Sequence, residues 1–162
     1  MEIRPVDLHD ADQIVQICNH YIKNTHYTFE TESSNPIEMG ARICETAEDY
    51  AYLVAEERGE ILGYAYAHEF KSRPAYNHSV EVSVYIKNDA VQKGIGTELY
   101  RCLFPKIYQT DVHAIIAGIA LPNDASIRLH EKMGMEKVAH FREVGFKLGR
   151  WIDVAYWEMI IT

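Results

Sequence analysis

Between a strand-like run and a helix-like run, the chain carries the sequence Gln92-Lys93-Gly94-Ile95-Gly96-Thr97. Gly94 and Gly96 have no Cβ atom, so a bulky anion can come close to the backbone there. The unpaired N–H groups of the first helical turn would point at that anion, which is the chemistry of a pyrophosphate site. The alternative is a glycine turn that only reverses the chain, because a G-x-G pair alone is weak evidence.

Two other phosphate-binding motifs do not fit this segment. A dinucleotide fingerprint needs a small residue where Leu99 stands, and it normally follows the first strand of its domain. A P-loop needs the pattern G-x-x-x-x-G-K-[ST], which the chain does not contain. A turn close to the type Q/R-x-x-G-x-G/A remains, with Val91 at the first position of that pattern and Gln92 at the second.

The composition is that of an ordinary globular domain. Of 162 residues, 48% are hydrophobic and 25% are charged, so we expect a single domain over residues 1–162. The net charge of -8 repels polyanions and argues against a general nucleic-acid or acidic-membrane binder. A small anion would have to be held locally, by backbone N–H groups and a few placed cations.

The sequence shows no pattern typical of a membrane span, a signal peptide or a set of disulfide bonds. The chain has no apolar run that approaches the roughly 20 residues of a membrane span, and no apolar signal core at its start, which predicts a cytoplasmic protein. Cys18, Cys44 and Cys102 are odd in number and contain no C-x-x-C pair. We therefore expect neither a disulfide framework nor a cysteine-rich zinc site.

The first half of the chain predicts two helices and a hairpin. After a short strand over residues 2–6, Asp7 can cap a helix with apolar positions at Leu8, Ala11, Ile14, Val15, Cys18 and Ile22. Residues 24–34 are a polar and aromatic loop, and Asn35-Pro36-Ile37-Glu38 is an N-terminal cap for a second helix that ends near Asp49. Two β-rich segments, 50–57 and 60–70, flank Arg58-Gly59 and predict a hairpin.

The second half alternates strands and helices. Residues 71–76 are irregular and residues 79–86 predict a strand that leads to the glycine turn and a helix over 94–106. A strand over 113–120, a turn at 121–124, a helix over 125–133 stopped by Gly134, and strands near 136–141 and 152–161 complete the chain. The order β-α-α-β-β-β-α-β-α-β-β implies an α/β (α+β) domain with a mixed sheet covered by helices.

The glycine turn resembles the acetyl-CoA-binding motif of the GNAT acetyltransferase superfamily. Further motifs, spread over nearly the whole chain, are similar to the phosphinothricin (methionine sulfoximine/sulfone) N-acetyltransferase family: Asn19-His20-Tyr21, Thr28-Phe29-Glu30-Thr31, Arg73-Pro74-Ala75-Tyr76, Glu81-x-Ser83-Val84-Tyr85, Ala117-Gly118-Ile119, Leu121-Pro122-Asn123-Asp124-Ala125-Ser126 and Gly145-Phe146-Lys147-x-Gly149-x-Trp151-x-Asp153. The resemblance implies the GNAT fold, a mostly antiparallel mixed sheet with a splayed central strand pair and helices on both faces.

The resemblance assigns the catalytic base to Glu81. Acetyl transfer to an amine needs a neutral nucleophile, and the amine of a free amino acid is mostly protonated near pH 7, so a base must remove its proton directly or through water. Glu81 matches the catalytic Glu of the family, although an outward-facing strand carboxylate is the alternative. His130 stands where many members carry a Tyr that acts as general acid, so it is a neighbour of the active site and a candidate acid.

The same resemblance assigns the cofactor, acetyl-CoA, to main-chain groups at Val84, Tyr85 and Ile86 and to the glycine turn. Asn123 matches the residue that binds the pantetheine or acetyl end, but it could instead cap a helix, as could Asp124. Lys93 and Lys132 could meet CoA phosphates or could simply be solvent-exposed lysines.

For the acceptor amine, the matching positions are Phe29, Glu30, Arg73, Pro74, Ala75 and Tyr76. The planar fork of Arg73 suits a carboxylate or phosphinate, although it could also be an ordinary surface residue. Lys147 and Trp151 could shape this pocket or only anchor the last strands. Members of the family dimerise, which implies a homodimer here.

Three functions remain open at this point. The leading one is N-acetylation of a small amino acid analogue such as phosphinothricin, methionine sulfoximine or methionine sulfone. The second is acetylation of a polyamine, an aminoglycoside or a protein N-terminus, which Glu30 and Glu32 would suit. The third is an acyl-CoA-binding module without catalysis. The histidines have no metal-ligand spacing and the chain has no G-x-S-x-G elbow, so we expect no metal and no serine hydrolase.

Overall fold

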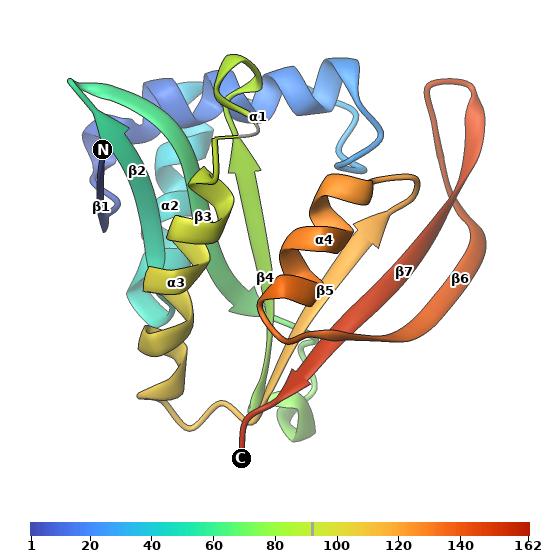
Figure 1. Cartoon of the computed structure of the whole chain (residues 1–162). Helices are drawn as coiled ribbons and strands as arrows, with labels where there is room; N and C mark the ends of the chain where they lie inside the picture. Colours follow the sequence, from blue (N-terminus) through green and yellow to red (C-terminus); the bar gives the residue numbers. More distant parts are fainter. Residues whose placement is uncertain (92) are drawn as a thin grey trace. The chain divides into compact units, whose positions relative to one another are not determined.

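The computed structural model describes residues 1–91 and 93–162 (Figure 1). Strands and helices follow one another in the order expected from the sequence. They are β1 (Glu2–Pro5), α1 (Ala11–Asn24), α2 (Pro36–Asp49), β2 (Tyr52–Glu57), β3 (Glu60–Glu69), β4 (Ser79–Ile86), α3 (Ile95–Tyr108), β5 (Ala114–Ala120), α4 (Asp124–Lys132), β6 (Glu136–Lys147) and β7 (Arg150–Ile160). Short 3-10 turns lie at Leu8–Asp10, Pro74–Tyr76 and Asn88–Ala90.

The strands form a seven-stranded mixed sheet in the order β1-β2-β3-β4-β5-β7-β6. The pairs β1–β2, β2–β3, β5–β7 and β6–β7 are antiparallel, whereas β4 and β5 are parallel. In the described part of the chain the parallel ladder joins Ser79–Glu81 to Ala114–Ile116, so it ends at Glu81. The expected mixed and mostly antiparallel sheet is confirmed.

The chain divides into two compact units, each built from separate segments. The first unit holds Met1–Asn19, Ser34–His68 and Val82–Asp111, and the second holds His20–Ser33, Glu69–Glu81 and Val112–Thr162. Strand β4 therefore gives its first residues, up to Glu81, to the second unit and the remainder to the first.

In the first unit, helices cover both faces of the strands. Tyr52, Leu53, Val54 and Ala55 of β2 are all buried, although successive side chains of a strand point to opposite faces. Helices α2 and α3 both contact β2. Figure 1 shows α3 in front of these strands and α2 behind them. Burial on both faces explains why this segment is a nearly continuous apolar run.

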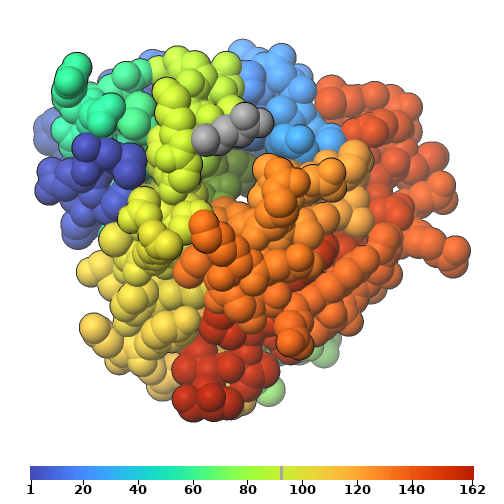
Figure 2. Space-filling view, viewed as in Figure 1, coloured from blue at the N-terminus to red at the C-terminus, as the bar shows by residue number. Residues whose placement is uncertain are grey.

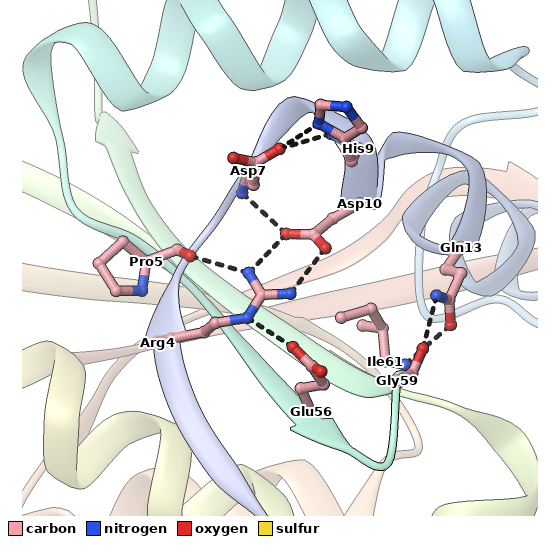
Figure 3. Close-up of polar contacts among 9 residues, drawn as sticks. All are labelled: Arg4, Pro5, Asp7, His9, Asp10, Gln13, Glu56, Gly59 and Ile61. Carbon is pink, nitrogen blue, oxygen red and sulfur yellow. Dashed lines mark hydrogen bonds and ion pairs between the residues drawn. The ribbon is translucent and has the colours of Figure 1, made fainter.

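A part-buried group of ion pairs anchors the start of the first unit (Figure 3). The guanidinium of Arg4 donates from Nη1 and Nη2 to both carboxylate oxygens of Asp10, at 2.9 and 2.8 Å, and from Nε to Glu56 at 2.6 Å. Burial alone would raise the pKa of Asp10, but the hydrogen bonds from Arg4 and from the Asp7 N–H outweigh it and lower that pKa. The paired charges join β1 to the following turn and to β2.

In the second unit, α4 covers one face of the sheet. Helix α4 contacts β5, and the Trp157 indole N–H donates to Glu131 of α4 at 3.2 Å. Trp157 is buried and pairs with Ala117, so both side chains belong to the covered face. Gly118 points to the other face and is exposed.

Local signals in the sequence predicted several boundaries correctly. Asn35 caps α2 by accepting from the Glu38 N–H at 3.0 Å, with Pro36 at the first helical position. Arg58 and Gly59 have φ values of 53° and 82° and close the β2–β3 hairpin. Positive φ at both turn residues matches the right-handed twist of the strands.

The structure corrects four expectations. Leu8 is 55% exposed and lies in a 3-10 turn before α1, so it is not part of the buried helix face. Helix α3 starts at Ile95 with Gly94 as its cap and continues to Tyr108, two residues beyond the expected end. Strand β6 reaches Lys147 because a register shift between Phe141 and Gly145 lets pairing resume, and β7 begins at Arg150.

None of the helices built from residues 1–91 and 93–162 combines the length and the apolar character needed to cross a membrane.

Candidate active site

Glu81 lies at the end of the parallel ladder in the second unit. Its Cα pairs with Ile116 of β5, and two residues further along β5 is Gly118, on the same face of the sheet. A Cβ atom added to Gly118 would lie 3.3 Å from Oε1 of Glu81. The carboxylate therefore borders an exposed position where the chain has no side chain.

Tyr156 of β7 flanks the same position from the other side. It pairs with Gly118, and a Cβ atom on Gly118 would lie 3.0 Å from Cε1 and 3.3 Å from Cζ of the tyrosine ring. We call the group Glu81, Gly118 and Tyr156 the Gly118 site. A carboxylate beside an open position can receive a proton from a bound ammonium group.

Tyr156 stays protonated at neutral pH. Burial raises its pKa, and the negative charge of Glu81 raises it further. Its ring also packs edge-on against Phe141 of β6, with centroids 5.9 Å apart. No sequence pattern singles out Tyr156, because only the register between β5 and β7 places it opposite Gly118.

The expected cofactor strand lies in the first unit. Lys87 donates its N–H to the carbonyl of Leu62 in β3 at 2.8 Å, so its main-chain groups point toward β3. Because these directions alternate along a strand, Tyr85 also directs its groups toward β3, whereas Val84 and Ile86 direct theirs toward the other edge. Val84 and Ile86 are therefore the better placed of the three to bind a pantetheine arm through the main chain.

The strand is held closely against β3 at one glycine. A Cβ atom on Gly63 would lie 2.8 Å from Cδ1 of Ile86 and 2.9 Å from the carbonyl oxygen of Tyr85. The ring of Tyr85 also packs on Tyr64, with centroids 5.5 Å apart. Gly63 thus permits the close approach that fixes this stretch of β4.

The glycine turn forms the N-terminus of α3, in the same unit. Gly94 is the N-cap, in a left-handed conformation with φ of 76°, and a Cβ atom there would meet nothing within 4 Å. Ile95, Gly96 and Thr97 form the first helical turn, whose N–H groups have no intrahelical partner. Lys93 is exposed beside them, and the expected contact of Gln92 falls outside the described residues. This arrangement can bind an anion through main-chain groups.

Asn123 is the cap of α4, in the second unit. Its side-chain oxygen accepts from the Ser126 N–H at 3.2 Å, so Asn123 and not Asp124 performs the capping. Because its side-chain oxygen is used in the cap, Asn123 would bind pantetheine through its amide NH2 group. Lys132 is exposed at the other end of the helix.

His130 is buried in α4. Its Nδ1 lies 2.7 Å from the Ser126 carbonyl oxygen, which only accepts, so Nδ1 carries the proton. Burial lowers the pKa of His130, and the hydrogen bond to Ser126 opposes that shift without reversing it. A neutral imidazole that is already donating to a carbonyl is a poor proton donor for a leaving thiolate. The role of His130 as an acid stays a prediction, and burial favours the neutral form of its ring.

The acceptor residues expected from the sequence lie on two segments of the second unit. Phe29 and Glu30 are exposed on the loop of residues 25–33, and the ring of Phe29 rests on Gly145 of β6. Arg73 precedes the exposed 3-10 turn of Pro74, Ala75 and Tyr76, and its side chain makes no capping hydrogen bond there. The Tyr76 ring packs edge-on against Phe70.

Among the described residues, no group of three or more His, Cys, Asp or Glu side chains is arranged to hold a metal ion.

Comparison with known proteins identifies the family. The sequence model of the Acetyltransferase (GNAT) domain matches residues 3–156. Phosphinothricin N-acetyltransferase of Streptomyces coelicolor is 40% identical, over 98% of this chain and 95% of its own. L-methionine sulfoximine/L-methionine sulfone acetyltransferase of Salmonella typhimurium is 32% identical, over 98% of this chain and 94% of its own.

A solved structure agrees with these relatives. The GNAT superfamily phosphinothricin acetyltransferase of Sinorhizobium meliloti, crystallised in complex with AcCoA, matches with a TM-score of 0.95 and 33% identity, over 99% of this chain and 88% of that one. The chain therefore belongs to the GNAT acetyltransferase family, and its activity is acetyl-CoA-dependent N-acetyl transfer.

Proposed function

We propose that the chain acetylates the amino group of a small amino acid analogue such as phosphinothricin, methionine sulfoximine or methionine sulfone, with Glu81 as general base. The observation that carries this proposal is the Glu81 carboxylate beside the exposed position over Gly118. The names of the relatives, which are phosphinothricin and methionine sulfoximine/sulfone acetyltransferases, support the choice of acceptor.

The transfer is direct. Glu81 takes a proton from the ammonium group of the acceptor, and the neutral nitrogen attacks the carbonyl carbon of the thioester. The C–S bond breaks and CoA leaves as a thiolate, which needs little help because thiols have a pKa near 8.5. The nitrogen loses its second proton as the amide forms, and that proton ends on the thiolate to give the CoA thiol. Glu81 precedes Val84 by three positions on β4, so one strand carries both the base and the main-chain groups proposed for the thioester.

The cofactor is held by main-chain groups. Val84 and Ile86 bind the pantetheine arm, the first turn of α3 binds the pyrophosphate, and Lys93 adds a nearby positive charge. Such local binding suits a chain whose net charge is -8.

A panel of acceptors tests the proposed function. Release of the free CoA thiol would be followed with phosphinothricin, methionine sulfoximine and methionine sulfone, and with spermidine, an aminoglycoside and a short peptide. We expect kcat/KM to be at least about 10²-fold higher for an amino acid analogue, because Arg73 can pair with its anionic group and is left unpaired by a polycation. Preference for a polycation or a peptide would support the second function, and no turnover of any amine would support a binding module.

We also propose that the chain is a homodimer, with residues 73–76 near the interface. Large apolar side chains are exposed on the β6–β7 hairpin, which projects from its unit (red in Figures 1 and 2). They are Val138, Phe141, Val144, Phe146, Leu148 and Trp151, each more than 50% exposed. Apolar surface of this kind marks interaction sites.

Light scattering tests the dimer. The wild-type chain at micromolar concentration should show twice the mass of 18.7 kDa. Trp151→Glu should lower that mass, because a charge would be buried in the interface. Ile37→Glu, at an 86% exposed position on α2, is the matched control and should leave the mass unchanged. A monomeric wild-type chain with full activity contradicts the proposal.

A further inference from the structure

We propose that the end of the β6–β7 hairpin, through Gly145, Lys147 and Arg150, holds the loop of residues 25–33 in the position that Phe29 and Glu30 need to receive the acceptor. These three are positioning residues for the acceptor site, and the inference rests on the proposed function. The loop has no helix or strand of its own. Hairpin and loop adjoin within the second unit (red and blue in Figure 2).

Lys147 fixes the backbone just before Phe29. Its side chain is only 5% exposed, and Nζ donates to the carbonyl oxygen of Thr28 at 2.7 Å. Burial lowers the pKa of Lys147, and the negative charge of Glu30 opposes that shift. Because the acceptor atom belongs to the main chain, this contact holds the loop whatever side chain stands at position 28.

The ring of Phe29 packs directly against Gly145, where no side chain stands in its way. A Cβ atom at position 145 would lie 2.4 Å from both Cε2 and Cζ of that ring. Carbon atoms cannot approach so closely, so any other residue must move the ring. The atoms in the way are the far end of a partly exposed side chain, so the ring can turn aside while the fold remains.

Arg150 holds the start of the loop through His26. An Nη2 donor of Arg150 lies 2.8 Å from Nδ1 of His26, whose Nε2 lies 2.8 Å from the carbonyl oxygen of Pro122. The carbonyl only accepts, so Nε2 carries the proton and Nδ1 accepts from Arg150. His26 thereby ties the loop both to the hairpin and to the turn that precedes Asn123.

A two-residue turn brings these contacts together. Lys147 pairs with Arg150 across Leu148 and Gly149, whose φ values are 54° and 75°. The contacts join residues more than 110 positions apart in the sequence, at three points of one loop. An irregular loop takes its position from such contacts. The hairpin end therefore controls acceptor binding without touching the acceptor.

Gly145→Ala is the main test, with Gly40→Ala as the matched control because an added Cβ there meets nothing within 4 Å. The acceptor KM of Gly145→Ala should rise at least about tenfold, while the KM for acetyl-CoA stays within twofold of wild type. Phe29→Ala and the double variant Phe29→Ala/Gly145→Ala should have the same acceptor KM, because without the ring Gly145→Ala has nothing to displace.

Hydrogen exchange gives a readout independent of activity. Lys147→Met removes the hydrogen bond to Thr28, so amide exchange over residues 25–33 should become at least about tenfold faster than in Gly40→Ala. Unchanged exchange in a folded Lys147→Met protein, or an unchanged acceptor KM in an active Gly145→Ala enzyme, would overturn the inference. If the wild type acetylates none of the amines, the proposed function fails, and the exchange measurement still tests the hold on the loop.

Discussion

Replacing Glu81 by Gln should lower kcat by about 10²-fold or more if proton removal from the amine limits the reaction. The change keeps the size of the side chain and removes the basic oxygen that lies beside the Gly118 position. The KM for acetyl-CoA should stay nearly constant, because the proposed thioester contacts are main-chain groups of Val84 and Ile86. Steady-state kinetics with both substrates varied would measure the two effects separately.

The pH dependence of this variant should identify the step that Glu81 serves. As pH rises from 7 to 9 toward the pKa of the acceptor amine, a growing fraction of the acceptor is already neutral, so the loss caused by Glu81→Gln should shrink. Tyr156 does not interfere in this range, because burial and the charge of Glu81 hold its pKa above the ordinary value near 10.

Glu158→Gln is the matched control for the base. Glu158 lies on β7 opposite Ile116, on the same face of the sheet as Glu81, and is part-exposed like it. We expect this variant to keep kcat within about threefold of wild type. If Glu81→Gln instead kept kcat/KM for the acceptor amine within about threefold of the wild-type value at every pH between 7 and 9, another group or a bound water would be the base.

Replacing Gly96 by Val should raise the KM for acetyl-CoA by about 10- to 100-fold. Gly96 stands in the first turn of α3, where a branched side chain would lie against the pyrophosphate and separate it from the helix N–H groups. Each hydrogen bond to a charged group is worth about 1.5–3 kcal/mol, which corresponds to roughly this loss in affinity. The acceptor KM should change much less.

Gly40→Val is the control for the glycine turn. It makes the same substitution in a helix, at a position where an added Cβ atom meets nothing within 4 Å. Valine has a higher helix propensity than glycine, so the fold should be kept, and the KM for acetyl-CoA should remain that of the wild type. Normal cofactor affinity in a folded Gly96→Val protein would show that the pyrophosphate lies elsewhere.

Local sequence patterns were enough to predict the order of the elements and most of their ends. Asn35 before Pro36, and Arg58 before Gly59, act through atoms only a few residues away, so their effect is already present in the sequence. Motifs near Gly94 and Glu81 likewise indicated the family before any geometry was known, and the comparisons confirm it.

The sequence did not reveal which side chains meet across the sheet. Glu81, Gly118 and Tyr156 come together only through the register of β4, β5 and β7, and a strand pattern carries no record of its partner's register. The same holds for the β6 register shift after Phe141, which extends that strand to Lys147.

The sequence by itself therefore determined what depends on neighbours along the chain: the helix caps, the hairpin turn and the glycine turn that starts α3. The tertiary structure alone decided that Asn123 rather than Asp124 caps α4, and that His130 is buried, which lowers its pKa. It also decided that Lys147 reaches Thr28 across the unit. Hydrogen-bond partners and burial depend on segments that approach only when the chain folds, and the free energy of those contacts is absent from any local pattern.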